Sequence, residues 1–278
     1  MAARTVERII EGQFVNDGAG VRLRRIIGTP QADYIDPFLL LDEFRTDAAD
    51  DYIAGFPEHP HRGFETVTYM IHGRMRHRDS VGNSGVLSDG ALQWMTAGRG
   101  IIHSEMPEQT DGLLWGYQLW VNLPAALKMS APRYQDIPTD DIVEVKTDGM
   151  TVRVLAGAYG DQQASAQTLT PIGYLDVALA SGRTFHQPVP DGHTALVYVY
   201  DGNLSEVGDR HTSVPLGTLA VLSRTGDIRI AAGSDGAKFL LLSGAPIDEP
   251  IARMGPFVMS NEAEIRQAIL DFRAGTLA

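Results

Sequence analysis

The sequence contains no cysteine among its 278 residues. Disulfide bonds, thiolate zinc sites and a cysteine nucleophile are therefore excluded. The sequence also lacks any apolar run that approaches about 18 residues, so no membrane partner or membrane-spanning segment is expected. The opening stretch, MAARTVERIIEG, lacks the apolar centre of a signal peptide, and we therefore expect a cytoplasmic location.

Positive charge is also scarce. The chain carries 23 Lys and Arg residues against 35 Asp and Glu residues, which gives a formal net charge of −12. Non-specific nucleic-acid binding depends on basic surface that displaces counterions from phosphates, so no nucleic-acid partner is expected. Hydrophobic residues make up 44% of the chain, enough for the core of an ordinary globular protein.

Long helical patterns are few, and most of the chain consists of short β-branched and aromatic runs separated by Gly, Asp, Asn and Pro. Such runs predict strands, and their regular spacing favours a β-sandwich or barrel. The predicted strands are ETVTYMI (65–71), ALQWMT (91–96), GYQLWVNL (116–123), MTVRVLAG (150–157), YLDVALA (174–180), ALVYVYDG (195–202), GTLAVLS (217–223) and KFLLLSG (238–244).

One helix is predicted near the C-terminal end, over SNEAEIRQAILDFRAG (260–275). Ser260 or Asn261 suits the N-cap, apolar residues follow at helical spacing, and Gly275 suits the end. The segment 124–141 contains three prolines and a polar end, and we interpret it as the crossover between two domains.

The two halves of the chain resemble copies of one module. TYMIHGRM (68–75) aligns with VYVYDGNL (197–204), and GALQWM (90–95) aligns with GTLAVL (217–222). The offsets are 129 (197 − 68) and 127 (217 − 90) residues, as a duplicated β module would give. We therefore expect two domains, residues 1–130 and residues 140–278.

Four ionisable residues of the first copy have no ionisable counterpart in the second. This asymmetry indicates that the first copy carries a site that the second copy lacks. The aligned pairs are His59 with Pro188, His61 with Pro190, His103 with Ile230, and Glu105 with Ala232.

The four residues form two pairs at strand spacing. His59 and His61 are two residues apart, as are His103 and Glu105, so each pair points to one face of its strand. If both segments line the inside of a small barrel, three imidazole nitrogens and one carboxylate oxygen converge. That donor set suits a borderline divalent metal ion and leaves positions open for water, substrate or dioxygen.

The identity of the carboxylate ligand is open on these grounds. Glu65 has the same strand parity as His59 and His61 and is an alternative to Glu105. A bulge at Gly63 would break that parity.

The other histidines of this region show no such pairing. His72 ends a predicted strand beside Gly73 and is expected at the surface. His77 has two interpretations: it approaches the pocket, or it has a structural role.

At this point the sequence resembles a known family. GFPEHPHRGFETVTYMIHG (55–73) resembles the first cupin motif, and HPHRGFETV with LQWMTAGRGIIHSEMP is similar to the pirins. DPFLLLDEF, QLWVNLP and GPFVMSNEAEIRQAILDFRAG also look like pirin segments, so the resemblance covers most of the chain. It implies an all-β bicupin fold, with two tandem jelly-roll cupin barrels, a short C-terminal helix and a metal site in the first barrel only. The implied ligands are His59, His61, His103 and Glu105.

The resemblance also implies an activity. Some pirins resemble flavonol 2,4-dioxygenases (quercetinases), which open the flavonol ring with dioxygen and release carbon monoxide. We therefore expect a quercetin 2,3-dioxygenase-like oxidoreductase with one divalent metal ion, Fe²⁺ first and Cu²⁺, Mn²⁺, Ni²⁺ or Zn²⁺ as alternatives. Glu105 is expected to be the catalytic base that takes the proton of the flavonol 3-hydroxyl. The apolar residues expected to pack the substrate are Phe56, Met95, Ile102 and Met106.

Two alternatives stay open at this stage. Other pirins act in the nucleus on transcription factors, which implies an iron-binding, redox-sensing regulator that works through a protein partner. A non-oxidative cupin, such as a sugar isomerase, would be active with zinc or manganese and indifferent to oxygen. The duplicated module already supplies a pair of barrels, so a monomer is expected.

Overall fold

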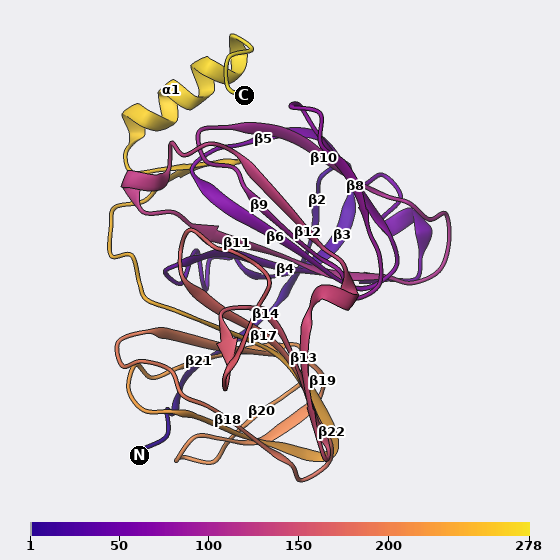
Figure 1. Ribbon diagram of the computed structural model, residues 1–278, viewed down its shortest axis with the longest axis vertical. Coiled ribbons are helices and arrows are strands. Elements are labelled where there is room, and N and C mark those ends of the chain that lie inside the picture. Colours follow the sequence, from indigo (N-terminus) through magenta and orange to yellow (C-terminus); the bar gives the residue numbers. More distant parts are fainter. Residues whose placement is uncertain (1) are drawn as a thin grey trace. The chain divides into compact units, whose positions relative to one another are not determined.

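The computed structural model describes residues 2–278, in which the regular secondary structure is almost wholly β-strand (Figure 1). The described residues contain one α-helix, close to the C-terminal end. This confirms the predicted all-β class with a short C-terminal helix. Within residues 2–278, no helix is both long and apolar enough to cross a membrane.

The chain forms two compact units, neither of which is one continuous stretch. The N-terminal unit contains Gln13–Thr29, Phe38–Thr139 and Ile247–Ala278. The C-terminal unit contains Pro30–Pro37, Asp140–Pro246 and the residues up to Gly12. The predicted ranges, 1–130 and 140–278, therefore differ from these units at both chain ends. Each terminal segment belongs to the unit with which its backbone and side chains pair.

The N-terminal unit contains a seven-stranded antiparallel sheet in the order β12-β9-β6-β11-β4-β3-β2. Its strands are β2 (Gln13–Asp17), β3 (Val21–Ile27), β4 (Phe38–Thr46), β6 (Phe64–His72), β9 (Leu92–Thr96), β11 (Leu114–Asn122) and β12 (Arg133–Ile137). The strand β12 lies inside the segment that was interpreted as a crossover. Its sequence RYQDI is too polar to predict a strand, yet it pairs with β9 along its whole length.

A second, four-stranded sheet of this unit has the order β5-β10-β7-β8. Its strands are β5 (Phe56–His61), β7 (Met75–Asp79), β8 (Ser84–Leu87) and β10 (Ile101–Pro107). Figure 1 shows β5 and β10 side by side. The two sheets share one interior, because Thr68 of β6 donates a hydrogen bond to Glu105 of β10.

Apolar side chains from both sheets fill part of this interior. Burying a side chain such as Leu, Phe or Met stabilises the folded state by about 1.5–3 kcal/mol relative to leaving that side chain exposed to water. The cluster comprises Leu23, Phe44, Tyr52, Met70, Met75, Leu87, Ala91 and Leu114.

The C-terminal unit is built around one nine-stranded sheet with the path β1-β21-β19-β22-β17-β14-β13, and β18 and β20 pair with β22 and β19. The strands are β1 (Val6–Glu11), β13 (Val143–Thr147), β14 (Met150–Ala156), β17 (Ile172–Leu179), β18 (Thr184–Gln187), β19 (Thr194–Val207), β20 (Thr212–Val214), β21 (Thr218–Leu222) and β22 (Ile228–Gly244). A short hairpin joins β15 (Ala158–Tyr159) to β16 (Gln162–Gln163). All eight predicted strands coincide with observed ones, namely β6, β9, β11, β14, β17, β19, β21 and β22.

Equivalent hydrogen bonds in the two units support the predicted duplication. The backbone N–H of Gly90 donates to the carbonyl of Met70 at 2.9 Å, and that of Gly217 donates to the carbonyl of Val199 at 2.7 Å. Both glycines have φ +74°, in the left-handed region that favours glycine. The sequence separations of these matched residues are the predicted 129 and 127.

The alignment of the first histidine needs a correction. Across β5 and β10, His59 lies opposite His103. Across β18 and β22, Phe185 lies opposite Ile230. With Ile230 aligned to His103, the strand register places Phe185, and not Pro188, at the position of His59.

The counterpart of His61 in the second copy needs the same correction. His61 lies opposite Ile101, and Gln187 lies opposite Ile228. Gln187 therefore takes the place that the sequence alignment gave to Pro190. Neither replacement is ionisable, so the asymmetry between the two copies remains.

The last residues of the chain complete the N-terminal unit. A hairpin of β23 (Ala252–Met254) and β24 (Phe257–Met259) precedes the helix α1 (Glu262–Arg273). Asn261 is the N-cap of α1, as predicted, and its side chain accepts a hydrogen bond from the Glu264 backbone at 3.0 Å. The Glu264 carboxylate in turn accepts one from the backbone of Ser260, the residue before the N-cap, which gives a variant of the capping box.

Replacing Asn261 by Ala is expected to lower the free energy of unfolding by about 1 kcal/mol, because the Glu264 N–H loses its acceptor. Amide exchange in the first turn of α1 would report this loss most directly. The control is Ser260→Ala, because Ser260 contributes only its backbone N–H to the capping box. Equal protection from amide exchange in the first turn of α1 in the two variants would contradict the capping role of Asn261.

Candidate metal centre

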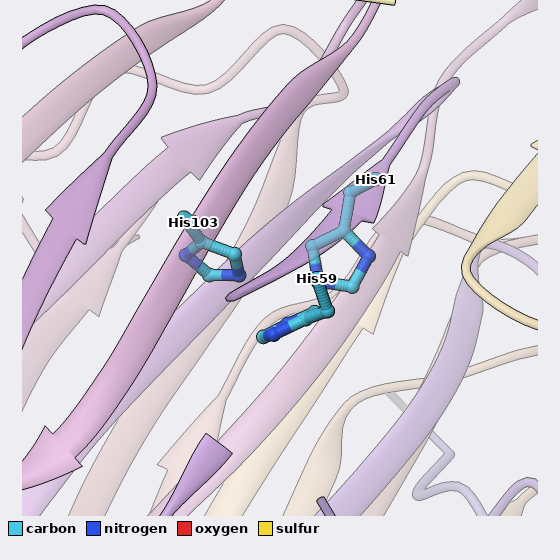
Figure 2. Close-up of side chains that lie close together, drawn as sticks. All are labelled: His59, His61 and His103. Atoms are coloured by element: carbon cyan, nitrogen blue, oxygen red, sulfur yellow. The ribbon is translucent and has the colours of Figure 1, made fainter. Parts of the chain in front are cut away.

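Three histidine rings converge from two neighbouring strands of the N-terminal unit. His59 and His61 lie on β5 and His103 lies on β10. The ring centroids are 4.6 Å apart for His59 and His61, 4.5 Å for His59 and His103, and 5.0 Å for His61 and His103. Figure 2 shows the rings facing a common space, and one nitrogen of each lies within 4.8 Å of the others.

The protonation state of these rings suits metal binding. His61 and His103 are 3% and 1% exposed. Burial first, and then the neighbouring histidines, hold the pKa of both rings well below the usual value, so both are neutral. The Nδ1 atom of His59 lies 2.8 Å from the carbonyl of Pro57, which leaves Nε2 with a lone pair when Nδ1 carries the proton.

Ring nitrogens without hydrogen-bond partners show whether the three histidines fit a metal ion. Within residues 2–278, neither ring nitrogen of His103 has a hydrogen-bond partner, nor does Nδ1 of His61. A buried polar atom without a partner costs about 1–3 kcal/mol, and a cation removes that cost for the one nitrogen of each neutral ring that carries a lone pair. The three neutral imidazoles therefore fit a divalent metal ion, although donors of this type do not select one metal.

Glu105 lies at the edge of the histidine cluster. Its Oε2 is 4.0 Å from Nε2 of His103, and the residue is 4% exposed. Thr68 donates to Oε1 at 2.7 Å, and the Gln118 amide donates to both oxygens at 3.0 and 3.2 Å. These donors stabilise the charged carboxylate and fix its orientation.

Thr68 and Gln118 were not among the predicted site residues, although their sequence positions carry a signal. Both are polar residues at inward positions of predicted strands, and they lie opposite each other across β6 and β11. Such a pair inside a barrel requires a polar partner, and that partner is Glu105.

Glu65 has a different environment. It is fully buried on β6 and accepts a hydrogen bond from Thr96 at 2.7 Å. Glu65 and Thr68 are three residues apart on one strand, so they point to opposite faces of the sheet. Gly63, with φ +92°, separates β5 from β6, so the strand parity of the histidines does not continue to Glu65.

His77 is 2% exposed, and its Nε2 lies 2.8 Å from the carboxylate of Asp136. The ring stacks on Tyr134 with a centroid distance of 5.6 Å. This environment fits the structural interpretation of His77. His72, in contrast, is exposed and pairs with Asp89, in agreement with its predicted surface position.

Two buried cations hold the turn that follows the histidine strand. Lys128 donates to the carbonyls of Gly63 at 2.9 Å and Val258 at 3.1 Å. The Arg62 guanidinium donates to Asp271 of α1 at 2.7 Å. The burial of Lys128 lowers its pKa to about 8. These contacts fix the end of β5, and with it the position of the histidines.

A cavity of about 570 Å³ lies beside the histidines, within the N-terminal unit. His59, His61 and Glu105 line it together with charged, amide and apolar side chains. Of the four predicted apolar residues, only Phe56 lines the cavity; Met95 and Ile102 lie in other apolar clusters, and Met106 is not part of the lining. The apolar walls are Leu23, Leu40, Phe44, Phe56 and Trp120.

The duplicated β unit, with a histidine cluster and a cavity inside the first copy, defines the class as a bicupin. The chain belongs to the pirin family. The family model Pirin matches residues 20–121, and the model of the Pirin C-terminal cupin domain matches residues 174–278.

Known proteins match along nearly the whole chain. A pirin-like protein of Caulobacter vibrioides is 50% identical over 283 residues, which covers 99% of each chain. Human pirin is 42% identical over 262 residues, which covers 93% of this chain and 88% of that protein. The crystal structure of a quercetin 2,3-dioxygenase from Acinetobacter baumannii superposes with a TM-score of 0.91 at 36% identity and covers 100% of this chain and 99% of its own. These matches confirm the predicted family and the bicupin fold.

Proposed function

We propose that this pirin is a metal-dependent dioxygenase that opens the ring of a flavonol such as quercetin with O₂ and releases carbon monoxide. The observation that carries the proposal is a three-histidine cluster with Glu105 at the wall of a cavity of about 570 Å³ that has both apolar and polar walls. A cavity of this size suits a flat aromatic ligand. The similarity to a solved quercetin 2,3-dioxygenase supports the same substrate class.

His59, His61, His103 and Glu105 are the proposed ligand set, and Fe²⁺ is the metal we propose, with Cu²⁺, Mn²⁺, Ni²⁺ and Zn²⁺ as alternatives. A bound divalent ion would supply a Lewis acid that lowers the pKa of the flavonol 3-hydroxyl. The overall change consumes one O₂ per flavonol and gives one CO and one ring-opened ester.

Glu105 is the proposed base for the 3-hydroxyl proton. Thr68 and Gln118 hold its carboxylate toward the cavity, so little reorientation is needed when the proton arrives. Once Glu105 is protonated, the neutral acid retains the Thr68 and Gln118 contacts. The proton therefore stays beside the substrate and is available to the ring-opened product.

The apolar walls have a second role, which is to position the rings and exclude water. Trp120 lies edge-on to His61, with a centroid distance of 5.2 Å, and also packs against Phe64. Its indole is thus held rigidly beside the histidine cluster. Phe56 lines the same cavity, and together these aromatic faces suit a planar substrate.

The experiment that tests this function starts from metal-stripped protein, reloaded with Fe²⁺ without oxygen and then mixed with quercetin in air. We expect O₂ uptake, loss of the flavonol colour and CO release in equal amounts. The His59→Ala, His61→Ala double variant serves as the control and should show none of these. Tight metal binding without O₂ uptake, for Fe²⁺, Cu²⁺, Mn²⁺ and Ni²⁺ alike, would contradict the proposal.

That negative result would favour the regulatory alternative, in which the metal redox state controls binding to a protein partner. Turnover of another substrate with zinc or manganese, without oxygen, would favour a non-oxidative cupin. The cytoplasmic location, the monomeric state and the lack of nucleic-acid and membrane partners stay predictions.

Replacing Glu105 by Gln is expected to lower kcat by about 100-fold or more at full metal occupancy, because an amide cannot take the substrate proton. The measurement is kcat together with the metal content of the same sample. Glu58→Gln is the matched control, because Glu58 is an exposed carboxylate at the rim of the same cavity. Unchanged turnover in fully loaded Glu105→Gln would remove Glu105 from the role of base.

A further inference from the structure

A row of polar side chains crosses the large sheet of the N-terminal unit on its inner face. The strand register places Arg25 opposite Asp42, Asp42 opposite Gln118, and Gln118 opposite Thr68. Directly opposed residues point to the same face of a sheet, so all four point into the barrel. Polar residues in a barrel interior require partners, and each of the four has at least one.

Arg25 is held rigidly in this row. Its Nε donates to Asp42 at 2.9 Å, and its Nη2 donates to Asp42 at 2.7 Å and to Asp17 at 2.6 Å. The pair with Asp42 is bidentate, which fixes the plane of the guanidinium. The remaining nitrogen, Nη1, makes no hydrogen bond within the described residues, and the Arg25 side chain is 19% exposed.

The same cavity joins this arginine to the histidine cluster. Arg25, Asp42 and Asp17 all line the cavity that contains His59 and Glu105. Arg25 lies on β3 and the Glu105 partner Gln118 lies on β11, two strands away, which corresponds to roughly 10 Å. The cavity therefore holds a base and metal-ligand cluster and also a fixed hydrogen-bond donor, which lies two strands away from Gln118 on the wall formed by the large sheet. We call the part of the cavity beside Arg25 its far end.

The local charges favour a neutral oxygen at the far end. Asp17 and Asp42 balance the positive charges of Arg25 and Arg253, and Arg253 lines the same cavity and acts on Asp42, so a carboxylate would meet no excess positive charge there. A hydroxyl can accept a hydrogen bond from Nη1 and donate one to a neighbouring carboxylate. A phenolic hydroxyl is thus the group that this end of the cavity suits best.

We propose that Arg25 is a specificity-determining residue, which donates a hydrogen bond through Nη1 to a hydroxyl at the end of the substrate remote from its reacting enol. The site then selects elongated aromatic enols with a distal hydroxyl over analogues that lack it. This inference rests on the proposed function, because it takes the flavonol as the substrate class. Asp42 and Asp17 are positioning residues that act through Arg25.

The test compares the binding of two flavonols by metal-loaded protein in the absence of oxygen. Quercetin carries hydroxyls on both outer rings, whereas 3-hydroxyflavone carries only the enol. We expect the wild-type protein to bind quercetin about tenfold more tightly, and Arg25→Lys to lose that preference without a change in its affinity for 3-hydroxyflavone. Lysine keeps a positive charge for Asp42 but loses the planar donor set.

The matched control is Arg24→Lys. Arg24 is the residue before Arg25 on β3, so its side chain lies on the opposite face of the sheet, where its guanidinium is 4.9 Å from the ring centroid of Phe14. We expect this variant to keep the wild-type preference. Equal affinity of the wild-type protein for both flavonols would overturn the inference, and this comparison needs no variant. An equal loss of affinity for both flavonols in Arg25→Lys would also overturn it.

The outcomes separate this inference from the proposed function. Selective binding of quercetin without turnover in air would overturn the function and leave the recognition by Arg25 supported. Turnover with equal affinity for both flavonols would overturn the inference alone. Failure of the wild-type protein to bind either flavonol would overturn both.

Discussion

Protein in which His59 and His61 are both replaced by Ala is expected to lose stoichiometric binding of divalent metal. Only His103 and Glu105 would remain near the cluster. Four-ligand zinc sites have apparent binding free energies of about 10–16 kcal/mol, so the loss of two ligands is expected to weaken binding at least about a thousandfold. Metal content after equilibrium dialysis of stripped protein measures this directly.

The control for this variant is His72→Ala with His186→Ala. Both side chains are more than half exposed and pair with surface carboxylates, Asp89 and Asp227. This variant should bind one metal ion as the wild-type protein does. Thermal unfolding gives a second measurement, because metal should raise the Tm of the wild-type and control proteins only. One tightly bound ion in the His59, His61 variant would show that the metal lies elsewhere.

Replacing Arg4 by Met is expected to lower the free energy of unfolding of the C-terminal unit by about 3–5 kcal/mol. Arg4 is fully buried, and each hydrogen bond that its guanidinium makes within residues 2–278 goes to a backbone carbonyl. Methionine fills a similar volume but leaves several buried oxygens without a donor. The acceptors are the carbonyls of Val189 (3.3 Å), Pro190 (2.7 Å), His193 (2.7 Å), Ser223 (2.9 Å) and Gly226 (2.8 Å).

Amide exchange in β1 and β21 under increasing denaturant measures this effect, because these paired strands follow Arg4 and precede Gly226. Arg8→Met is the matched control. Arg8 lies on β1, and its exposed guanidinium makes one hydrogen bond of 3.3 Å to the carbonyl of Gln31. A loss of less than about 1 kcal/mol in Arg4→Met would mean that water replaces the guanidinium at these carbonyls.

Patterns within single strands predicted most of the architecture. The runs ETVTYMI and ALVYVYDG correspond to β6 and β19, because the β-branched and aromatic content that predicts a strand is a property of a few neighbouring residues. The helix was predicted with its N-cap for the same reason, since Asn261 and Glu264 are close in sequence. By contrast, the polar strand β12 forms only because β9 supplies its hydrogen-bond partners.

The candidate site was predictable only in part. The two-residue spacing of His59 and His61 predicted that they point together, and the structure brings them together with His103. The spacing left Glu65 and Glu105 as rival carboxylates. In the structure Glu105 lies beside His103, whereas Glu65 lies on another face and is bonded to Thr96. Whether Glu105 binds the metal stays a prediction.

The all-β class, the terminal helix and the pairing of His59 with His61 followed from the sequence alone, because each depends on residues that are neighbours along the chain. The duplication also followed from the sequence, because the two copies keep similar residue patterns at nearly constant offsets of 127 and 129 residues. The tertiary structure decided which groups meet across strands. The turn at Gly63 ends the alternation of side chains along β5, so the face shared by His59 and His61 does not continue to Glu65. The register of β18 places Phe185 at the position that the sequence alignment gave to Pro188. The contacts of Glu105 and the bidentate hold on Arg25 arise from cross-strand register, which turns and long-range pairing set together.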